Sequence, residues 1–216
     1  LRAEFALAKA ANQAIPDTHD YREDETRDLF IDVLLREAGW TLSEARDVEF
    51  PVTGMPNNSD GGKGFVDYVL WGDNGLPLGL VEAKRTRKSP IAGQQQAKLY
   101  ADRLEAAYGQ RPIIFYTNGY EHHIWDDASY PPRRVDGFYT RDQLELLIQR
   151  RSTRKSLASL EVRPAIADRY YQQRAVRKVG EAFEKKERRV LLVMATGSGK
   201  TRTVIALADL LIRANW

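Results

Sequence analysis

The sequence lacks cysteine and any long hydrophobic run, and each absence excludes a class of protein. Without cysteine, the 216-residue chain has no disulfide framework and no thiolate metal site. Because no run of 18 apolar residues occurs, we expect no membrane-spanning segment and no membrane partner. The beginning of the chain also lacks the pattern of a signal peptide. These absences fit a cytoplasmic protein.

The composition is otherwise typical of a globular protein. Charged residues make up 29% of the chain and hydrophobic residues 43%, and the length suffices for one full domain plus part of another. The net charge of +3 permits nucleic-acid binding without arguing for it, so clusters of charge matter more. Because the chain begins at Leu1 without methionine and ends at Trp216 inside a pattern, we expect a fragment.

The stretch from Phe65 to Arg85 predicts a β-hairpin with charged residues on its strands. Two apolar, β-rich runs flank Asp73-Asn74-Gly75, and Asn-Gly is the strongest short signal for a type I′ turn, in which both central residues have positive φ. With the turn centred after Asn74, residues whose numbers sum to 149 face each other. Asp67 is then expected opposite Glu82, on the same face of the sheet.

Lys84 is expected on that face too, because strand side chains alternate with a period of two. The turn end of the face is apolar, with Val69, Trp71, Leu78 and Leu80. Two adjacent carboxylates repel each other and invite a divalent cation, and Mg²⁺ suits a site with few protein ligands. A lysine beside it can position an attacking water and offset phosphate charge. The alternative is a surface hairpin with a Glu–Lys ion pair.

The remaining elements alternate in a way that predicts an α/β fold. The predicted helices are Leu1–Ile15, Glu23–Ala38, Ile91–Tyr108 and Thr140–Arg150, the predicted strands are Val48–Val52, Pro112–Thr117 and His122–Trp125, and the predicted loops are Met55–Gly64 and Tyr130–Arg134. The apolar stripe expected on the second helix is Leu29, Phe30, Val33, Leu34 and Ala38. His122 and His123 point to opposite faces of a strand, which argues against a shared metal.

Three polar features near the predicted hairpin have ordinary structural interpretations, and two of them have functional alternatives as well. Glu25 borders the buried side of its helix, where an acid ordinarily stabilises the helix N-terminus. Gln96 and Tyr100 are four residues apart, so they share a helix face. The pair is either ordinary polar surface, a contact to the DNA backbone, or a brace for Lys84. The basic run 84–88 is either a solvated face or a phosphate contact.

A phosphate-binding motif lies near the end of the chain. The apolar run Val190–Met194 predicts a buried parallel strand, and Val204–Arg213 predicts a helix. Between them, glycines let backbone N–H groups wrap phosphates at the positive end of the helix. The loop residues are Thr196, Gly197, Ser198, Gly199, Lys200 and Thr201. Lys200 would reach the β and γ phosphates of ATP, and Thr201 would ligate Mg²⁺.

These motifs, in this order, resemble a known family. Asp67 followed by Glu82-Ala83-Lys84 resembles the core of PD-(D/E)xK nucleases, and Gln96-x-x-x-Tyr100 resembles the extra motif of their RecB-type branch. Glu25-Thr26-Arg27, Ala38-Gly39-Trp40 and MATGSGKT complete a pattern similar to the amino-terminal part of the restriction and motor (R) subunit of type I restriction enzymes. The resemblance covers essentially the whole chain.

The resemblance implies an architecture and residue roles. It implies a PD-(D/E)xK nuclease, with a mixed central sheet flanked by helices, over residues 1–150, a basic linker over 151–168 and the truncated start of a RecA-like lobe over 169–216. Asp67, Glu82 and the backbone carbonyl of Ala83 would hold Mg²⁺, Lys84 would position the hydroxide, and Glu25 would orient metal-bound water.

The same resemblance extends to the nucleotide site. Arg169-Tyr170-Tyr171-Gln172 is similar to the segment that reads adenine in superfamily 2 helicases, with Gln172 as the contact; the alternative is an ordinary helix start. Met194 stands where the general Walker pattern has glycine, as is usual in that superfamily. The acidic motif that completes the ATPase lies beyond Trp216, so we expect this fragment neither to hydrolyse ATP well nor to translocate.

The sequence therefore predicts a Mg²⁺-dependent endonuclease joined to the start of an ATP-driven translocase. Double-stranded DNA is the expected substrate, and the resemblance implies modification (methyltransferase) and specificity subunits as partners. One alternative is a phage-defence or repair helicase in which the nuclease fold serves as a DNA clamp. Another is a type III restriction subunit, although in that family the nuclease follows the motor.

Overall fold

The computed structural model describes residues 22–56, 62–187 and 189–216. The predicted helix Leu1–Ile15 and the middle of the predicted loop Met55–Gly64 lie outside the described residues. Contacts between Cα atoms divide the chain into a first unit, Leu1–Ile124 with Arg134–Thr140, and a second unit, Trp125–Arg133 with Arg141–Trp216. Each unit is described by itself.

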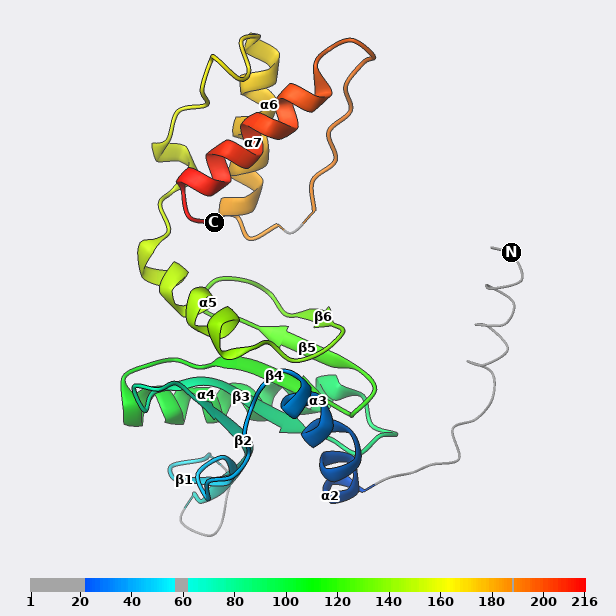
Figure 1. The fold of residues 1–216 in the computed structure, drawn as a ribbon, viewed down its shortest axis with the longest axis vertical. Helices are drawn as coiled ribbons and strands as arrows, with labels where there is room; N and C mark the ends of the chain where they lie inside the picture. Colours follow the sequence, from blue (N-terminus) through cyan, green and yellow to red (C-terminus); the bar gives the residue numbers. More distant parts are fainter. Residues whose placement is uncertain (1–21, 57–61, 188) are drawn as a thin grey trace, which may run out of the picture. The chain divides into compact units, whose positions relative to one another are not determined.

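The predicted α/β class and mixed sheet are confirmed (Figure 1). The strands, in chain order, are β1 (Val48–Val52), β2 (Gly64–Trp71), β3 (Pro77–Ala83), β4 (Ile113–Thr117), β5 (His122–Trp125) and β6 (Arg133–Val135). They are also neighbours in this order, with β1–β2 and β2–β3 antiparallel and β3–β4 parallel. β6 falls in a predicted loop, because three residues with two exposed arginines give too little apolar pattern to signal a strand.

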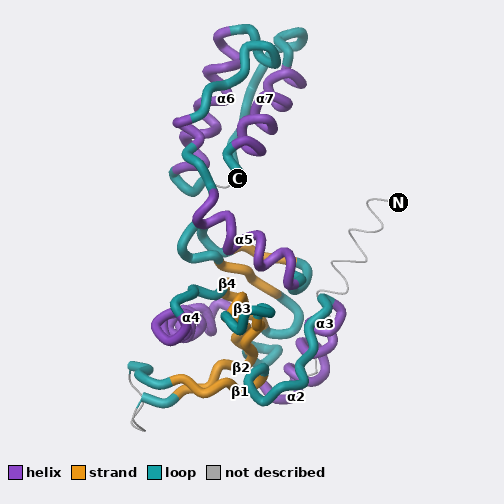
Figure 2. Tube along the Cα trace, turned by 60° about the vertical axis from the view of Figure 1, so that its left-hand side comes forward, coloured by secondary structure: helices purple, strands orange, loops and turns teal. Residues whose placement is uncertain are grey.

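Helices cover both faces of the central strands. All residues of β3 and β4 are buried, as expected for strands packed on both sides. α4 (Gln94–Tyr108) packs against β3 and β4, preceded by the 3-10 turn η2 (Pro90–Gly93). The helical segment formed by α2 (Glu23–Thr26), η1 (Arg27–Ile31) and α3 (Asp32–Glu37) lies on the opposite side (Figure 2).

The turn of the β2–β3 hairpin differs from the predicted type I′ turn. Gly75 has a φ of +76°, but Asn74 does not have positive φ. The Gly75 N–H donates to the carbonyl of Gly72 at 2.9 Å. This is a three-residue loop in which only the last residue is left-handed, a conformation that suits glycine because it has no Cβ.

The predicted register holds for the strands, although the turn is centred elsewhere. Next to the turn, Trp71 pairs with Pro77, whereas further along Tyr68 pairs with Val81, as the sum of 149 predicts. The register shift between the two pairings is a β-bulge in β3. Trp71 therefore does not face Leu78, which the sequence pattern had placed opposite it.

The amino-terminal helical segment forms where predicted, but a different face of it is buried. Leu29 and Val33 were predicted in the apolar stripe and are 53% and 46% exposed, whereas Thr26, Ile31 and Leu35 are fully buried. The reason is that η1 is a π-helix, whose i→i+5 hydrogen bonds place residues five apart on one face. A regular helical period therefore misplaced Leu29 and Val33, whereas the other predicted stripe residues, Phe30, Leu34 and Ala38, are partly buried.

The second unit contains three longer helices, α5 (Arg141–Thr153), α6 (Tyr170–Glu184) and α7 (Lys200–Arg213), and the short turn η3 (Leu157–Ser159). Its core consists of Leu157, Val162, Ala167, Val176, Ala206, Leu210 and Ala214. The predicted linker 151–168 is thus not a simple connection, because its apolar residues help form this core. The predicted domain end at residue 150 also falls inside α5. None of the helices in the described ranges is long and apolar enough to cross a membrane.

The predicted strand Val190–Met194 is not observed. The run has no regular secondary structure and no strand pairing, and Leu191 and Val193 are 86% and 87% exposed. A parallel strand is stable only between neighbouring strands, and the described part of the second unit supplies none.

Two leucine substitutions can test which face of the amino-terminal helical segment is buried. Leu35→Ala should lower the free energy of unfolding by about 2–5 kcal/mol, because it leaves a cavity under a fully buried side chain. Leu29→Ala should change it by less than about 0.5 kcal/mol. Urea unfolding followed by circular dichroism measures both; equal losses would contradict the assigned face.

Candidate active site

The candidate site lies where β2 separates from β3. The pair of the ladder farthest from the turn is Tyr68 with Val81, and Asp67 is the residue next to Tyr68, beyond this pair. At that point the Asp67 carboxylate replaces a main-chain acceptor, since its Oδ2 accepts the N–H of Ala83 at 2.7 Å. Burial raises the pKa of Asp67, while the Ala83 N–H and the Arg27 guanidinium oppose that rise.

Glu82 is a buried carboxylate beside Asp67. Its side chain is 2% exposed, and Oε1 accepts a hydrogen bond from Lys84 Nζ at 2.6 Å. Burial and the nearby Asp67 charge raise the pKa of Glu82 to about 8, although Lys84 opposes the rise. Glu82 Oε2 is buried and has no hydrogen-bond partner among the described residues, and such an atom calls for an explanation.

Lys84 is held by a network from three elements. Besides Glu82, its Nζ contacts Gln96 Oε1 at 3.2 Å and Glu23 Oε1 at 3.2 Å. Gln96 in turn donates through Nε2 to the Tyr100 hydroxyl at 2.9 Å. Burial disfavours the ammonium form, but the Glu82 and Glu23 carboxylates together outweigh it, and the pKa of Lys84 is raised. The structure thus brings the Gln96–Tyr100 pair into contact with Lys84.

Four residues at the site were missed from sequence. Gly93, before α4, lies so close that a Cβ there would be 3.1 Å from Glu82 Cγ and 3.3 Å from Lys84 Cε. Glu23 contacts Lys84, and Arg27 binds both Asp67 and Glu49. Gly93, Glu23 and Glu49 had no signal beyond an ordinary turn glycine and a helical or strand charge, because their partners are distant in sequence. Arg27 stood in the Glu25-Thr26-Arg27 motif, but the sequence assigned it no role.

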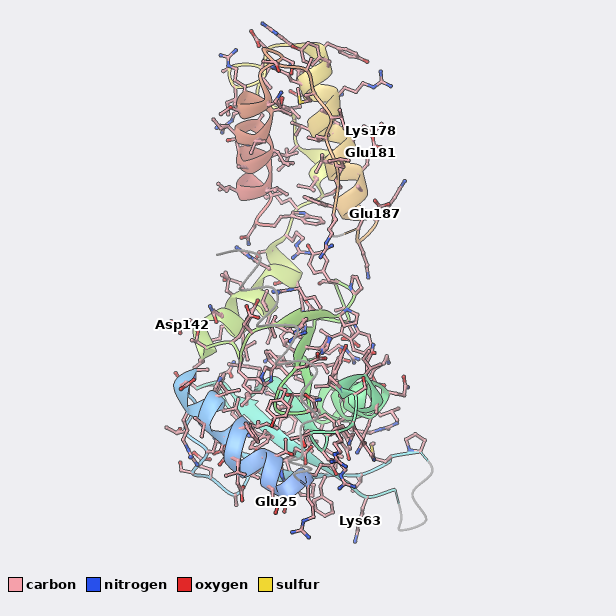
Figure 3. All side chains as sticks on the ribbon, turned by 90° about the vertical axis from the view of Figure 1, so that its right-hand side faces the viewer. Glu25, Lys63, Asp142, Lys178, Glu181 and Glu187 are labelled. Atoms are coloured by element: carbon pink, nitrogen blue, oxygen red, sulfur yellow. The ribbon has the colours of Figure 1, made fainter. Side chains whose placement is uncertain are left out.

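Glu25 is not brought to the site. Its Oε2 accepts the backbone N–H of Arg22 at 2.9 Å, a local contact at the beginning of the helical segment. Figure 3 shows Glu25 near the beginning of this segment, drawn in blue. The acid that reaches Lys84 is Glu23, because the helical turn directs positions 23 and 25 to different sides.

The donor set suits a hard divalent cation. Glu82 Oε2 offers a buried oxygen without a partner, next to the Asp67 carboxylate. Within the described ranges, no group of three or more His, Cys, Asp or Glu side chains could hold a metal. A cation here would therefore rely on two carboxylates, a backbone carbonyl such as that of Ala83, and water, a combination that Mg²⁺ accepts.

The basic run after Lys84 is held in place by Asn118. The Asn118 amide donates to the carbonyls of Thr86 and Lys88 at 3.2 and 3.0 Å, and its Oδ1 accepts two backbone N–H groups of its own loop.

The side chains of His122 and His123 point to different sides of their strand, as predicted, since the first contacts Thr117 and the second stacks on Tyr116.

In the second unit, the predicted phosphate loop precedes α7. Gly197 and Gly199 have φ of +76° and +83°, which lets the backbone curl. Lys200 Nζ donates to the carbonyls of Met194 and Ala195 at 3.0 and 3.1 Å. Thr196 and Thr201 are exposed, so Thr201 is accessible to a bound ion.

Gln172 lies against this loop. It is buried, and its Nε2 donates to the Ser198 carbonyl at 2.9 Å, as does the Tyr171 hydroxyl. Gln172 Oε1 has no hydrogen-bond partner among the described residues. The structure thus brings the two predicted nucleotide segments together.

Figure 3 also shows the exposed pair Lys178 and Glu181 on α6, which is an ordinary surface ion pair.

These observations define an α/β protein with an acidic pair and a lysine in one unit and a glycine-rich phosphate loop in the other. Two family models match the chain: "Type I restriction enzyme R protein N terminus" over residues 57–133, and "Type III restriction enzyme, res subunit" over residues 165–216. The segment with the acidic pair thus matches the type I family, and the type III model matches only the phosphate-loop segment.

Individual relatives agree. The chain is 29% identical to the type I restriction enzyme EcoKI endonuclease subunit of Escherichia coli K12, over 94% of this chain and 22% of the relative. It is 32% identical to the EcoAI endonuclease subunit of Escherichia coli, over 65% and 18%. A solved fragment assigned to an HsdR subunit of a type I restriction enzyme from Vibrio vulnificus YJ016 aligns with a TM-score of 0.51 and 26% identity, over 92% of this chain and 39% of that one.

The family model, the curated relatives and the solved fragment together support the family of type I restriction enzyme R subunits for this chain, as the motifs predicted. The chain spans about a fifth of the length of the curated relatives that it matches.

The raised pKa of Glu82 predicts a pH dependence of stability. Without metal, the folded state binds the Glu82 proton more tightly than the unfolded state does. The free energy of unfolding should therefore fall as the pH rises from about 4.5 to about 8. Thermal unfolding across this range in chelated buffer checks the slope. Glu82→Gln should flatten it, and a wild-type stability that rises with pH would contradict the assignment.

The close approach of Gly93 predicts a matched pair of alanine substitutions. Gly93→Ala should lower the free energy of unfolding by about 1–3 kcal/mol, because the new methyl group crowds Glu82 and Lys84. Gly137 is the control, since a Cβ there meets nothing within 4 Å. Chemical denaturation compares the two variants, and a neutral Gly93→Ala would mean that the site can relax.

Proposed function

We propose that the first unit is the Mg²⁺-dependent endonuclease of a type I restriction enzyme R subunit, and that the second unit begins its ATP-driven motor. The observation that carries the proposal is the pairing of the partly buried Asp67 and the buried Glu82 with Lys84, in which one Glu82 oxygen has no hydrogen-bond partner among the described residues. Both similar curated subunits are named as endonuclease subunits of type I restriction enzymes.

Asp67, Glu82 and the Ala83 carbonyl would hold Mg²⁺. When bound, the ion would supply Lewis-acid polarisation of the phosphate and a more acidic water. The protein's own part is positional. Asp67 is fixed by the Ala83 N–H, and Glu82 is fixed by Lys84, so both carboxylates present oxygens from a rigid sheet.

Lys84 is the group that would act on the attacking water and on developing phosphate charge. Its ammonium is a donor, and its contacts with Glu82 and Gln96 limit where it can point. Tyr100 fixes the Gln96 amide, which defines the direction of the Gln96 oxygen toward Lys84. The Gln–Tyr pair would therefore orient the lysine rather than react.

The basic segment 84–88 would contact the DNA backbone. Its main chain is held by Asn118, and Arg87 and Lys88 are exposed. A fixed basic loop next to the carboxylate pair suits phosphate contacts, which position DNA without reading sequence. Sequence recognition would then belong to the modification and specificity subunits of the complex.

The second unit would bind ATP through its loop. The backbone from Thr196 to Gly199 would wrap the phosphates, and Lys200 would exchange its two carbonyl partners for phosphate oxygens. Thr201 would ligate Mg²⁺. Gln172, whose Oε1 has no partner among the described residues, would contact the adenine.

The test uses the full-length R subunit with its modification and specificity partners, on unmethylated circular DNA with Mg²⁺ and ATP. Asp67→Ala and Lys84→Ala should each reduce double-strand cleavage at least about a hundredfold, because each removes a group acting on the reacting phosphate, and ATP turnover should persist. Gel analysis of the DNA and a phosphate-release assay measure the two activities.

Two further variants make the result specific. Lys98→Ala removes a lysine of α4 that pairs only locally with Asp102, and it should cut normally. Lys200→Ala should abolish ATP turnover. If Asp67→Ala and Lys84→Ala still cut DNA, the carboxylate pair is structural and the fold serves as a DNA clamp.

A further inference from the structure

Arg27 forms a bridge between two strands at the site. It begins the π-helical segment η1, and its guanidinium donates through Nη1 to Asp67 Oδ1 at 3.1 Å and through Nη2 to Glu49 Oε1 at 2.9 Å. The Arg27 and Asp67 side chains are only 18% and 20% exposed. Solvent screens this pair less than it screens a surface ion pair.

The two carboxylates bound by Arg27 are neighbours across the sheet. Val48 pairs with Tyr68 and Phe50 pairs with Val66, so the register places Glu49 opposite Asp67. Like charges directly opposite each other destabilise a sheet. Glu49 also has a φ of +50°, a left-handed conformation that is uncommon outside glycine and that persists only where the surroundings enforce it.

The contacts of Asp67 show what the bridge achieves. One oxygen accepts the Ala83 N–H and the other accepts Arg27, so the carboxylate is fixed from two directions. Glu82 has its own cation in Lys84. Without Arg27, Asp67 would keep one anchor and would face the negative charge of Glu49 on one strand and of Glu82 on the other.

Resting on the endonuclease function proposed above, we propose that Arg27 is a positioning residue for Asp67, itself anchored by Glu49. The forked guanidinium matters, because it donates to two carboxylates with two nitrogens in fixed geometry, whereas a lysine offers a single flexible nitrogen. Arg27 acts on the cation only through Asp67, in the manner of an outer partner that orients a metal ligand.

The first measurement is Mn²⁺ binding to the full-length subunit, by electron paramagnetic resonance, without DNA or ATP. Arg27→Gln should weaken Mn²⁺ affinity at the first-unit site about tenfold or more, the usual effect of losing an outer partner. Arg27→Lys should restore little. Thr201→Ala in every background removes the proposed metal ligand of the nucleotide site and hence its contribution.

The control is Arg36→Gln, which breaks a surface pair with Asp32 in the same helical segment and should leave Mn²⁺ affinity unchanged. In the reconstituted complex, Arg27→Gln should raise the metal concentration needed for half-maximal cleavage more than it lowers the maximal rate. A loss confined to the maximal rate would contradict positioning through Asp67.

A double-mutant cycle keeps the proposal falsifiable if Arg27→Gln alone unfolds part of the site. Glu49→Gln should weaken Mn²⁺ affinity less than Arg27→Gln, and the double variant should bind no worse than Arg27→Gln alone, because Glu49 acts through Arg27. Additive losses, or unchanged or tighter Mn²⁺ binding in Arg27→Gln, would overturn the inference. If Asp67→Ala and Glu82→Gln also leave Mn²⁺ binding and cleavage unchanged, the proposed function fails as well.

Discussion

The first unit depends on how two neighbouring carboxylates are kept within the sheet. Burying one charged group is costly, and burying two of the same sign close together is more so. The structure compensates by giving each carboxylate a cation, Lys84 for Glu82 and Arg27 for Asp67. The Ala83 N–H adds a further bond to Asp67. The pairs leave one Glu82 oxygen without a partner among the described residues, and that oxygen is what a bound cation would use.

The surrounding elements meet the geometric demands of this arrangement. The part of β2 before Tyr68 has to stand apart from β3 so that the Asp67 side chain can take the place of a main-chain acceptor. η2 has to approach closely enough to place Gln96 on Lys84, which Gly93 permits by lacking a side chain. The π-helical turn aims Arg27 at the site while keeping Ile31 in the core. Local departures from regular structure therefore gather around the charged groups.

In the second unit, by contrast, the glycine-rich loop forms although the strand predicted before it does not. The loop before α7 curls at its two glycines, and Gln172 contacts the Ser198 carbonyl. The run from Val190 to Met194, which the apolar pattern predicted to be a buried strand, has no strand pairing, and Leu191 and Val193 are exposed. The loop thus follows from local sequence, whereas the strand requires partners that the described residues do not provide.

The sequence by itself determined the features that depend on neighbours along the chain. Hydrophobic period and turn residues gave most strands and helices, and strand alternation placed Asp67, Glu82 and Lys84 on one face. Even the register of the hairpin was correct, although a bulge compensates for a turn centred elsewhere. Only the tertiary structure decided which distant groups complete the site. Arg27 and Glu23 reach it, and Glu25 does not, because a π-turn and the packing of a helical segment set their directions, and neither leaves a mark in the local sequence pattern.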